Sequence, residues 1–168
     1  QGIPFNEIMN TMTDGIKGAV PAVVILALAY SVNDLSKIMG TANYIVSISE
    51  GFLSAQLLPA IIFIISAIMS FSTGSSWGTF AICMPIALPL AFSFTGGDIT
   101  LLVYACFGAV AGGGVFGDHC SPLSDTTILA STGAASDHID HVKTQLPYAF
   151  VCGGVALIGY LILGFVGA

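Results

Sequence analysis

Residues 51–97 read GFLSAQLLPAIIFIISAIMSFSTGSSWGTFAICMPIALPLAFSFTGG, and these 47 residues include no Asp, Glu, Lys or Arg. A helix needs roughly 20 apolar residues to cross the hydrocarbon core of a bilayer, so this run is long enough for two crossings. Shorter charge-free runs cover residues 18–33, 99–117 and 144–168. Because a bilayer core offers no water to backbone groups, and these runs are continuous rather than alternating, the sequence predicts an all-α polytopic membrane protein.

The composition of the whole chain agrees with this prediction. Of its 168 residues 55% are hydrophobic and 7% are charged, whereas about a quarter of the residues in soluble domains are charged. The apolar content also excludes a disordered chain. The net charge of −6 and the absence of Arg exclude nucleic acid as a partner, because nucleic acid requires a basic surface. The four cysteines form no CxxC pair, and no cofactor is expected.

The polar and apolar segments divide the chain into successive elements. Residues 1–16 are interpreted as an amphipathic helix at the membrane interface, or alternatively as a linker. Residues 17–35 are predicted to form a first membrane span, and residues 41–54 a partial or interfacial helix. Residues 133–144, the most polar part of the chain, are predicted to form a loop outside the membrane. Residues 145–167 are predicted to form the last span.

Residues 57–94 are predicted to form a re-entrant hairpin with its tip at residues 72–79, STGSSWGT. Each apolar arm has about 15 residues, which is short for a full crossing. An alternative interpretation is an interfacial turn anchored by Trp77. The tip offers hydroxyl groups on a flexible backbone and contains no carboxylate; its candidate binding residues are Ser72, Thr73, Gly74, Ser75 and Ser76.

Residues 99–132 are predicted to form a discontinuous, unwound transmembrane helix, interrupted within GDHCSPLSDTT at residues 117–127. Asp118 and Asp125 lie seven residues apart between apolar segments, although a charge at the bilayer centre costs about 2.5–3.5 kcal/mol on insertion scales. Pro122 has no amide hydrogen and interrupts the helix. We expect Ser121 to be the N-cap of the second part and Pro122 its first helical residue.

Such a break gathers carboxylate, hydroxyl and carbonyl oxygens, which suit hard cations, and secondary transporters commonly bind their ions at broken helices. The alternative is an ordinary surface loop followed by a capped helix. His119 and Cys120 alone are too few ligands for zinc, but His119 could titrate near neutral pH and modulate transport. We expect His138, Asp140 and His141, in the predicted polar loop, to be solvated rather than to bind a metal.

Three segments together resemble a known family: FSTGSSWGTFAICMPIALPLA at residues 71–91, GDHCSPLSDTTILASTGA at residues 117–134 and DHIDHVKTQLPYA at residues 137–149. From about residue 20 to residue 168, the chain resembles the C-terminal half of NhaC-type sodium/proton antiporters. The resemblance implies one repeat of an inverted-repeat transporter of the ion-transporter superfamily. It also implies a multi-pass location in a bacterial plasma membrane, with the N-terminal half of the same transporter as partner.

By this resemblance, the hairpin tip and the unwound helix meet at the ion and substrate site. We hypothesise that Na+ binds Asp118 or Asp125 and that a proton neutralises the same carboxylate and expels the Na+. The other ligands would be Ser121, Ser124, Thr126 and the hydroxyl groups of the hairpin. Relatives of this family exchange organic solutes, so a small organic solute is a further candidate substrate. The alternative function is an ion channel or pore, and an enzyme is not expected because no nucleophile–base motif is present.

Overall fold

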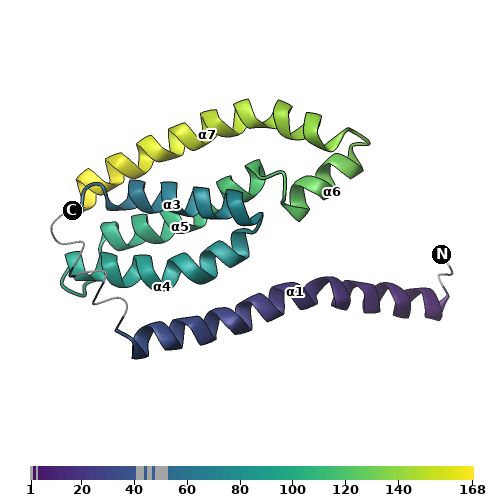
Figure 1. The fold of residues 1–168 in the computed structure, drawn as a ribbon, viewed down its shortest axis with the longest axis horizontal. Coiled ribbons are helices and arrows are strands. Elements are labelled where there is room, and N and C mark those ends of the chain that lie inside the picture. The colour runs from purple at the N-terminus through teal and green to yellow at the C-terminus, as the bar shows by residue number, and fades with distance from the viewer. Residues whose placement is uncertain (1, 3, 41–43, 45–46, 48–52) are drawn as a thin grey trace.

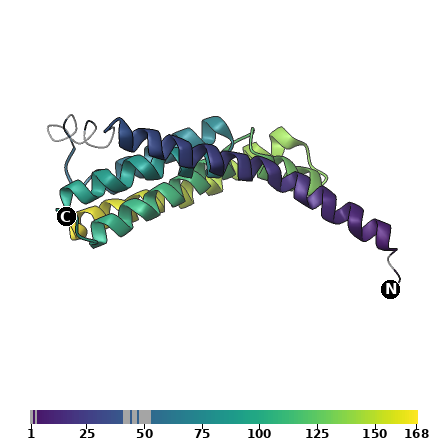
Figure 2. The same ribbon diagram turned by 90° about the horizontal axis from the view of Figure 1, so that it is seen from below.

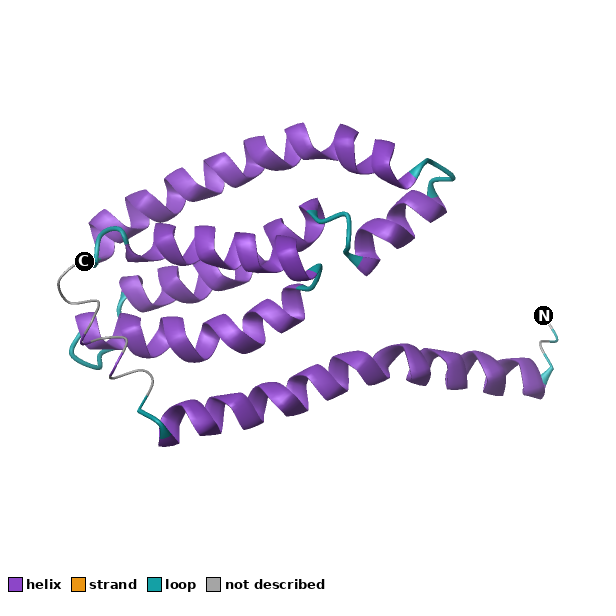
Figure 3. Cartoon of the chain, viewed as in Figure 1, coloured by secondary structure: helices purple, strands orange, loops and turns teal. Residues whose placement is uncertain are grey.

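The computed structural model describes residues 2, 4–40, 44, 47 and 53–168, and within this part of the chain every regular element is a helix (Figure 3). The helices are α1 (Phe5–Ile38), α3 (Leu58–Thr73), α4 (Ser76–Phe94), α5 (Leu101–Cys120), α6 (Asp125–Gly133) and α7 (His138–Gly167). The all-α prediction is therefore confirmed for these residues. The partial helix predicted over residues 41–54 lies, apart from residues 44, 47, 53 and 54, outside the described residues.

Three of the described helices are long and apolar enough to cross a membrane, as judged by length and composition: α4, α5 and α7. At 16 residues, α3 is apolar but shorter. Large apolar side chains cover the outside of α7 and are more than half exposed, which would be unfavourable in water and suits contact with lipid. They are Tyr148, Phe150, Val151, Val155, Ile158, Ile162, Phe165 and Val166.

The helix at the centre of the arrangement is α5, because α3, α4 and α7 all pack against it (Figure 1). The fully buried residues Cys106, Ala109 and Val110 lie in the middle of α5. Helix α1 packs on α4, and its N-terminal part extends beyond the other helices in both views (Figures 1 and 2). Short α6 follows α5 and contacts both α5 and α7.

Glycines on one side of α5 allow its backbone to approach that of α3. A Cβ atom on Gly117 would collide with the carbonyl oxygen of Ala67 and lie 2.8 Å from the amide nitrogen of Phe71. A Cβ atom on Gly113 would likewise collide with the backbone of α3. The hydroxyl group of Ser70 donates a hydrogen bond of 2.6 Å to the carbonyl oxygen of Gly114. Small residues are the usual means of close helix packing in membranes.

Aromatic side chains connect α7 to this pair of helices. The ring of Phe63 on α3 lies 5.3 Å from the ring of Tyr160 and 5.9 Å from that of Phe116, measured between centroids. The hydroxyl group of Tyr160 donates a hydrogen bond of 2.7 Å to the carbonyl oxygen of Gly108 on α5. The polar end of this half-buried tyrosine thus has a hydrogen-bond partner, as is usual for tyrosines in protein interiors.

Two predicted boundaries are wrong. The segments 1–16 and 17–35 were expected as separate elements, but α1, from Phe5 to Ile38, continues without a break across the boundary between residues 16 and 17. A change of composition does not interrupt backbone hydrogen bonds. The predicted loop 133–144 is also too long, since α7 begins at His138. Asp137 caps this helix by accepting hydrogen bonds from the amides of Ile139 and Asp140 at 3.0 and 3.1 Å. Polar residues there form the first turns of a helix.

The close contact between α3 and α5 gives a test of the fold. We expect Gly117→Ala to lower the free energy of unfolding by about 1–3 kcal/mol, because the added methyl group must push two backbones apart. Gly154→Ala on α7 is the control, since its Cβ atom would meet nothing within 4 Å. Thermal unfolding of the intact transporter in detergent measures the difference. Equal melting temperatures for the two variants would contradict this packing.

Candidate functional site

The interruption between α5 and α6 consists of residues 121–124. The amide of Ser121 donates to the carbonyl of Asp118 at 3.1 Å, and the amide of Ser124 donates to the carbonyl of Ser121 at 3.3 Å. Ser124 is the N-cap residue of α6 and Pro122 lies in the turn before it. The predicted start of this helix was therefore wrong by three residues, because Ser121 and Pro122 form the turn rather than the helix.

The interruption touches the loop between α3 and α4. The buried hydroxyl group of Ser121 donates to the carbonyl oxygen of Phe71, at the end of α3, at 2.7 Å. Gly74 has a φ angle of 65°, and a Cβ atom there would lie 2.7 Å from the carbonyl carbon of Leu123. It would also lie 2.9 Å from the amide nitrogen of Ser124. Residues 71–74 and 121–124, about 50 positions apart in the sequence, therefore lie in backbone contact.

The hairpin tip is shorter than the predicted range 72–79, because only Gly74 and Ser75 lie outside α3 and α4. Ser72 and Thr73 belong to the last turn of α3. Their exposed hydroxyl groups donate to carbonyls four residues earlier, at 2.8 and 3.0 Å. The hydroxyl group of Ser75 caps α4 by accepting from the amide of Gly78 at 3.3 Å, and Ser76 is the first residue of α4.

The two acidic residues near the interruption have different surroundings. Asp118 lies in the last turn of α5 and is half-buried. Its Oδ1 atom is buried and has no hydrogen-bond partner among the described residues. Asp125 is exposed and is the first residue of α6. A carboxylate is favoured at a helix N-terminus and disfavoured at a C-terminus, where the peptide dipoles place partial negative charge. Asp118 therefore lies at the less favourable end of a helix for a carboxylate, and Asp125 at the more favourable end.

The remaining predicted residues lie on both sides of the turn. The hydroxyl groups of Ser124, which is buried, and Thr126, which is exposed, are 2.7 Å apart. The side chain of His119 is exposed, while its backbone carbonyl accepts a hydrogen bond of 3.4 Å from the hydroxyl group of Thr127. Across the part of the chain that the structure describes, no three His, Cys, Asp or Glu side chains gather as a metal-binding group.

Residues 1–165 match the Na+/H+ antiporter family. The chain belongs to this family. It is 46% identical to an uncharacterized protein of Haemophilus influenzae over 95% of the chain and 30% of that protein. It is 27% identical to the malate-2H+/Na+-lactate antiporter of Bacillus subtilis over 98% of the chain and 34% of the relative. It is 28% identical to the Na+/H+ antiporter NhaC of Alkalihalophilus pseudofirmus over 96% of the chain and 34% of that relative.

The chain thus spans about a third of the length of these curated relatives. The resemblance to NhaC-type antiporters is confirmed, and a family of multi-pass transporters agrees with the three candidate spans. Transport and antiport are the activities of the family and its named members. No solved structure matches the chain significantly.

In this chain of the Na+/H+ antiporter family, the structure also brings two residues of α7 to the interruption that sequence reasoning missed. The Nε2 atom of His138 lies 2.8 Å from the carbonyl oxygen of Pro122, and the side-chain amide of Gln145 donates to the carbonyl oxygen of His119 at 2.7 Å. The expectation that His138 is solvated was therefore wrong. The sequence held one indication of this, because His138 and Gln145 are seven residues apart, on one face of the helix that follows α6 directly in sequence.

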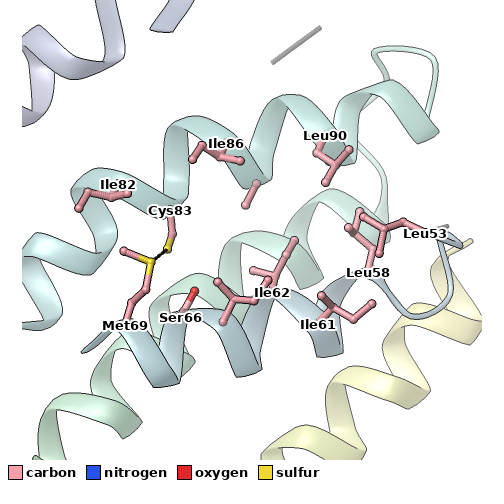
Figure 4. Close-up of a pocket in the computed structure, with 12 residues that line it drawn as sticks. Leu53, Leu58, Ile61, Ile62, Ser66, Met69, Ile82, Cys83, Ile86 and Leu90 are labelled. Carbon is pink, nitrogen blue, oxygen red and sulfur yellow. Dashed lines mark hydrogen bonds between the residues drawn. The ribbon is translucent and has the colours of Figure 1, made fainter. Parts of the chain in front are cut away.

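An apolar pocket of about 210 Å³ lies elsewhere, between α3 and α4 (Figure 4). Residues from positions 53–69 and 82–90 line it, and none of the predicted site residues does. Within it, the sulfur atoms of Cys83 and Met69 are 3.5 Å apart. The hydroxyl group of Ser66 is the one oxygen-bearing side chain among the lining residues. One hydroxyl group is too few to bind a hard cation, so the polar turns between the helices remain the candidate site.

The contact between the hairpin tip and the helix interruption can be tested with a pair of glycines. We expect Gly74→Ala to destabilise the protein by about 1–2 kcal/mol from its left-handed backbone alone, and further because its methyl group would meet the backbone of Leu123. Gly78→Ala is the matched control in the same hairpin, since its Cβ atom would contact only the Ser75 side chain, at 3.7 Å or more. The measurement is the melting temperature of each variant, which we expect to be lower for Gly74→Ala than for Gly78→Ala. Indistinguishable melting temperatures would argue against the contact.

Proposed function

We propose that this chain is part of a secondary active transporter that exchanges Na+ for H+ across a bacterial plasma membrane, with the rest of the transporter as its partner. The observation that carries the proposal is the state of Asp118. Its Oδ1 atom is buried without a hydrogen-bond partner among the described residues. Asp118 also precedes Ser121 by three residues in the sequence, and the hydroxyl group of Ser121 binds the end of α3.

One buried oxygen without a hydrogen-bond donor makes this carboxylate a candidate for exchange chemistry. An ionised carboxylate in an apolar surrounding is costly unless it is paired, and the C-terminal end of α5 adds further negative potential. A bound Na+ would compensate the charge, and a bound proton would remove it. Since either ion satisfies the same oxygen, binding of one disfavours binding of the other. This competition, combined with alternating exposure of the site to the two sides, gives antiport.

The surroundings of the two acids favour Asp118 over Asp125 as the exchanging group. The exposed carboxylate of Asp125 lies at the N-terminus of α6, where the helix dipole stabilises it without a bound cation. Oxygens close to the interruption are available to complete the shell of a transported Na+, which is bound by oxygen ligands. The candidates are the side chains of Ser121, Ser124 and Thr126, and those of Ser72, Thr73, Ser75 and Ser76 at the hairpin.

The names of two relatives suggest a further class of substrate for this chain. One relative is a malate-2H+/Na+-lactate antiporter and another is a Na+/H+ antiporter, so we include a small organic acid as a candidate co-substrate of this chain. The site at a helix interruption, of the kind found at the repeat interface of transporters, supports a requirement for the rest of the transporter. A channel is the second candidate, and it differs by giving flux without exchange.

The proposal predicts different effects for the two acids. Asp118→Asn should lower Na+-dependent proton flux by about 10-fold or more, because the amide cannot carry the exchanged proton or compensate a cation. Asp125→Asn should retain most of the flux and serves as the matched control. The measurement is proton flux in proteoliposomes of the intact transporter, with Na+, pH and organic acids varied in turn.

Two outcomes would contradict this function. The first is intact Na+-dependent proton flux in both Asp118→Asn and Asp125→Asn. The second is flux that does not saturate with Na+ and shows no counterflow of labelled Na+, which would indicate a channel. Loss of flux in Asp125→Asn alone would indicate that Asp125, rather than Asp118, is the carboxylate that exchanges Na+ for a proton.

A further inference from the structure

Two side chains of α7 bind backbone carbonyls at the interruption between α5 and α6. The amide group of Gln145 donates to the carbonyl oxygen of His119, near the end of α5, at 2.7 Å. The Nε2 atom of His138 lies 2.8 Å from the carbonyl oxygen of Pro122, in the turn itself. A carbonyl oxygen can only accept, so Nε2 of His138 must carry the hydrogen. Both side chains therefore act as donors.

The spacing of the two donors matches the helix that carries them. His138 and Gln145 are seven residues apart, which is about two turns, so they lie on the same face of α7. The carbonyls that they bind belong to His119 and Pro122, one before the end of α5 and one after it. A helix end leaves carbonyl groups without partners, and in an apolar surrounding such groups must find other donors. Helix α7 supplies these donors.

His138 is itself fixed by a second contact. Its Nδ1 atom lies 3.1 Å from the hydroxyl oxygen of Ser131 on α6, and that hydroxyl group lies 2.8 Å from the carbonyl oxygen of Ile128. Ser131 is buried and His138 is half-buried. The imidazole ring thus joins α6 and the turn before it to the first residue of α7. Contacts at both ring nitrogens therefore fix the orientation of the ring.

We propose that His138 and Gln145 form a clamp, called here the α7 clamp, that positions the interruption for cation binding. The inference rests on the proposed function. The hairpin loop holds the interruption from one direction through Ser121 and Gly74, and α7 holds it from another. Asp118 lies one residue before His119, whose carbonyl Gln145 holds. The clamp residues are positioning residues, because they act on the site through the backbone and do not contact the ion.

Loss of a clamp hydrogen bond should weaken Na+ binding more than it lowers the rate of turnover. Each clamp hydrogen bond contributes about 1 kcal/mol, so loss of one should raise the apparent KM for Na+ by roughly 5-fold. The maximal rate per folded transporter should change by less than about 2-fold. A residue with only a structural role would instead reduce the amount of folded transporter, which lowers the maximal rate and leaves KM unchanged.

Two substitutions at His138 separate its contacts. His138→Gln can keep a donor near the position of Nε2, and should retain the bond to Pro122 and a near-normal KM. His138→Asn can place its amide group only near the position of Nδ1, toward Ser131, and should raise KM. Gln145→Met keeps the length of the side chain without a donor and should also raise KM. His141→Gln, three residues further along α7, is the matched control, and its KM should stay normal.

The experiment measures KM for Na+ and maximal rate in proteoliposomes of the intact transporter, together with amide hydrogen exchange of residues 117–127. Higher KM and faster exchange in His138→Asn and Gln145→Met, with rescue in His138→Gln, are the expected results. Unchanged KM in both variants would overturn the clamp, as would equal impairment by His138→Gln and His138→Asn.

Failure of the proposed function is distinguishable from failure of the clamp. If the wild-type transporter shows no Na+-dependent proton flux, the proposed exchange is wrong. The proposed role of the clamp in cation binding is then also wrong. Faster hydrogen exchange in the clamp variants would still identify His138 and Gln145 as donors to the interruption. If wild-type flux is present and Asp118→Asn removes it, an unchanged KM in the clamp variants rejects the inference alone.

Discussion

Backbone groups in an apolar surrounding need hydrogen-bond partners, and the interruption of α5 after Cys120 removes the partners that a continuous helix would supply. Neighbouring segments replace them. The turn pairs its own amides, Thr127 and Gln145 donate to the carbonyl of His119, and His138 donates to that of Pro122. Among the buried side-chain oxygens at this place, Oδ1 of Asp118 has no hydrogen-bond partner in the described part of the chain. Because native proteins pair nearly all buried polar atoms, this oxygen requires a functional explanation.

The position of the interruption depends in turn on how closely α3 and α5 approach. Gly113 and Gly117 let the two backbones touch, and the hydroxyl of Ser70 bridges them. This packing brings the end of α3 to the end of α5. The carbonyl of Phe71 then meets the hydroxyl of Ser121, and Gly74 meets Leu123. The candidate site is therefore a product of helix packing as much as of the two loops.

Much of the fold could be predicted from the sequence, because apolar runs and clustered helix breakers are local signals. Helix boundaries were less predictable: the polar residues after Gly133 indicated a loop, yet Asp137 caps a helix and α7 begins at His138. The contact between residues 71–74 and 121–124 was predicted only from the family resemblance, because composition cannot show that segments 50 residues apart in the sequence lie side by side. The roles of His138 and Gln145 could not be predicted, because a donor to a distant carbonyl leaves no pattern in its own surroundings. The different surroundings of Asp118 and Asp125 could not be predicted either, because they depend on where α5 ends and where α6 begins.

An exchange site at Asp118 requires that Na+ and a proton compete for one carboxylate. The most direct measurement is calorimetric titration of the purified intact transporter with Na+, in two buffers of different ionisation enthalpy. We expect the binding heat to differ between the buffers, because each bound Na+ releases a proton to the buffer, and the affinity to fall as the pH is lowered. Asp118→Asn should abolish the proton release. Equal binding heats in both buffers, with an affinity independent of pH, would contradict competition at this carboxylate.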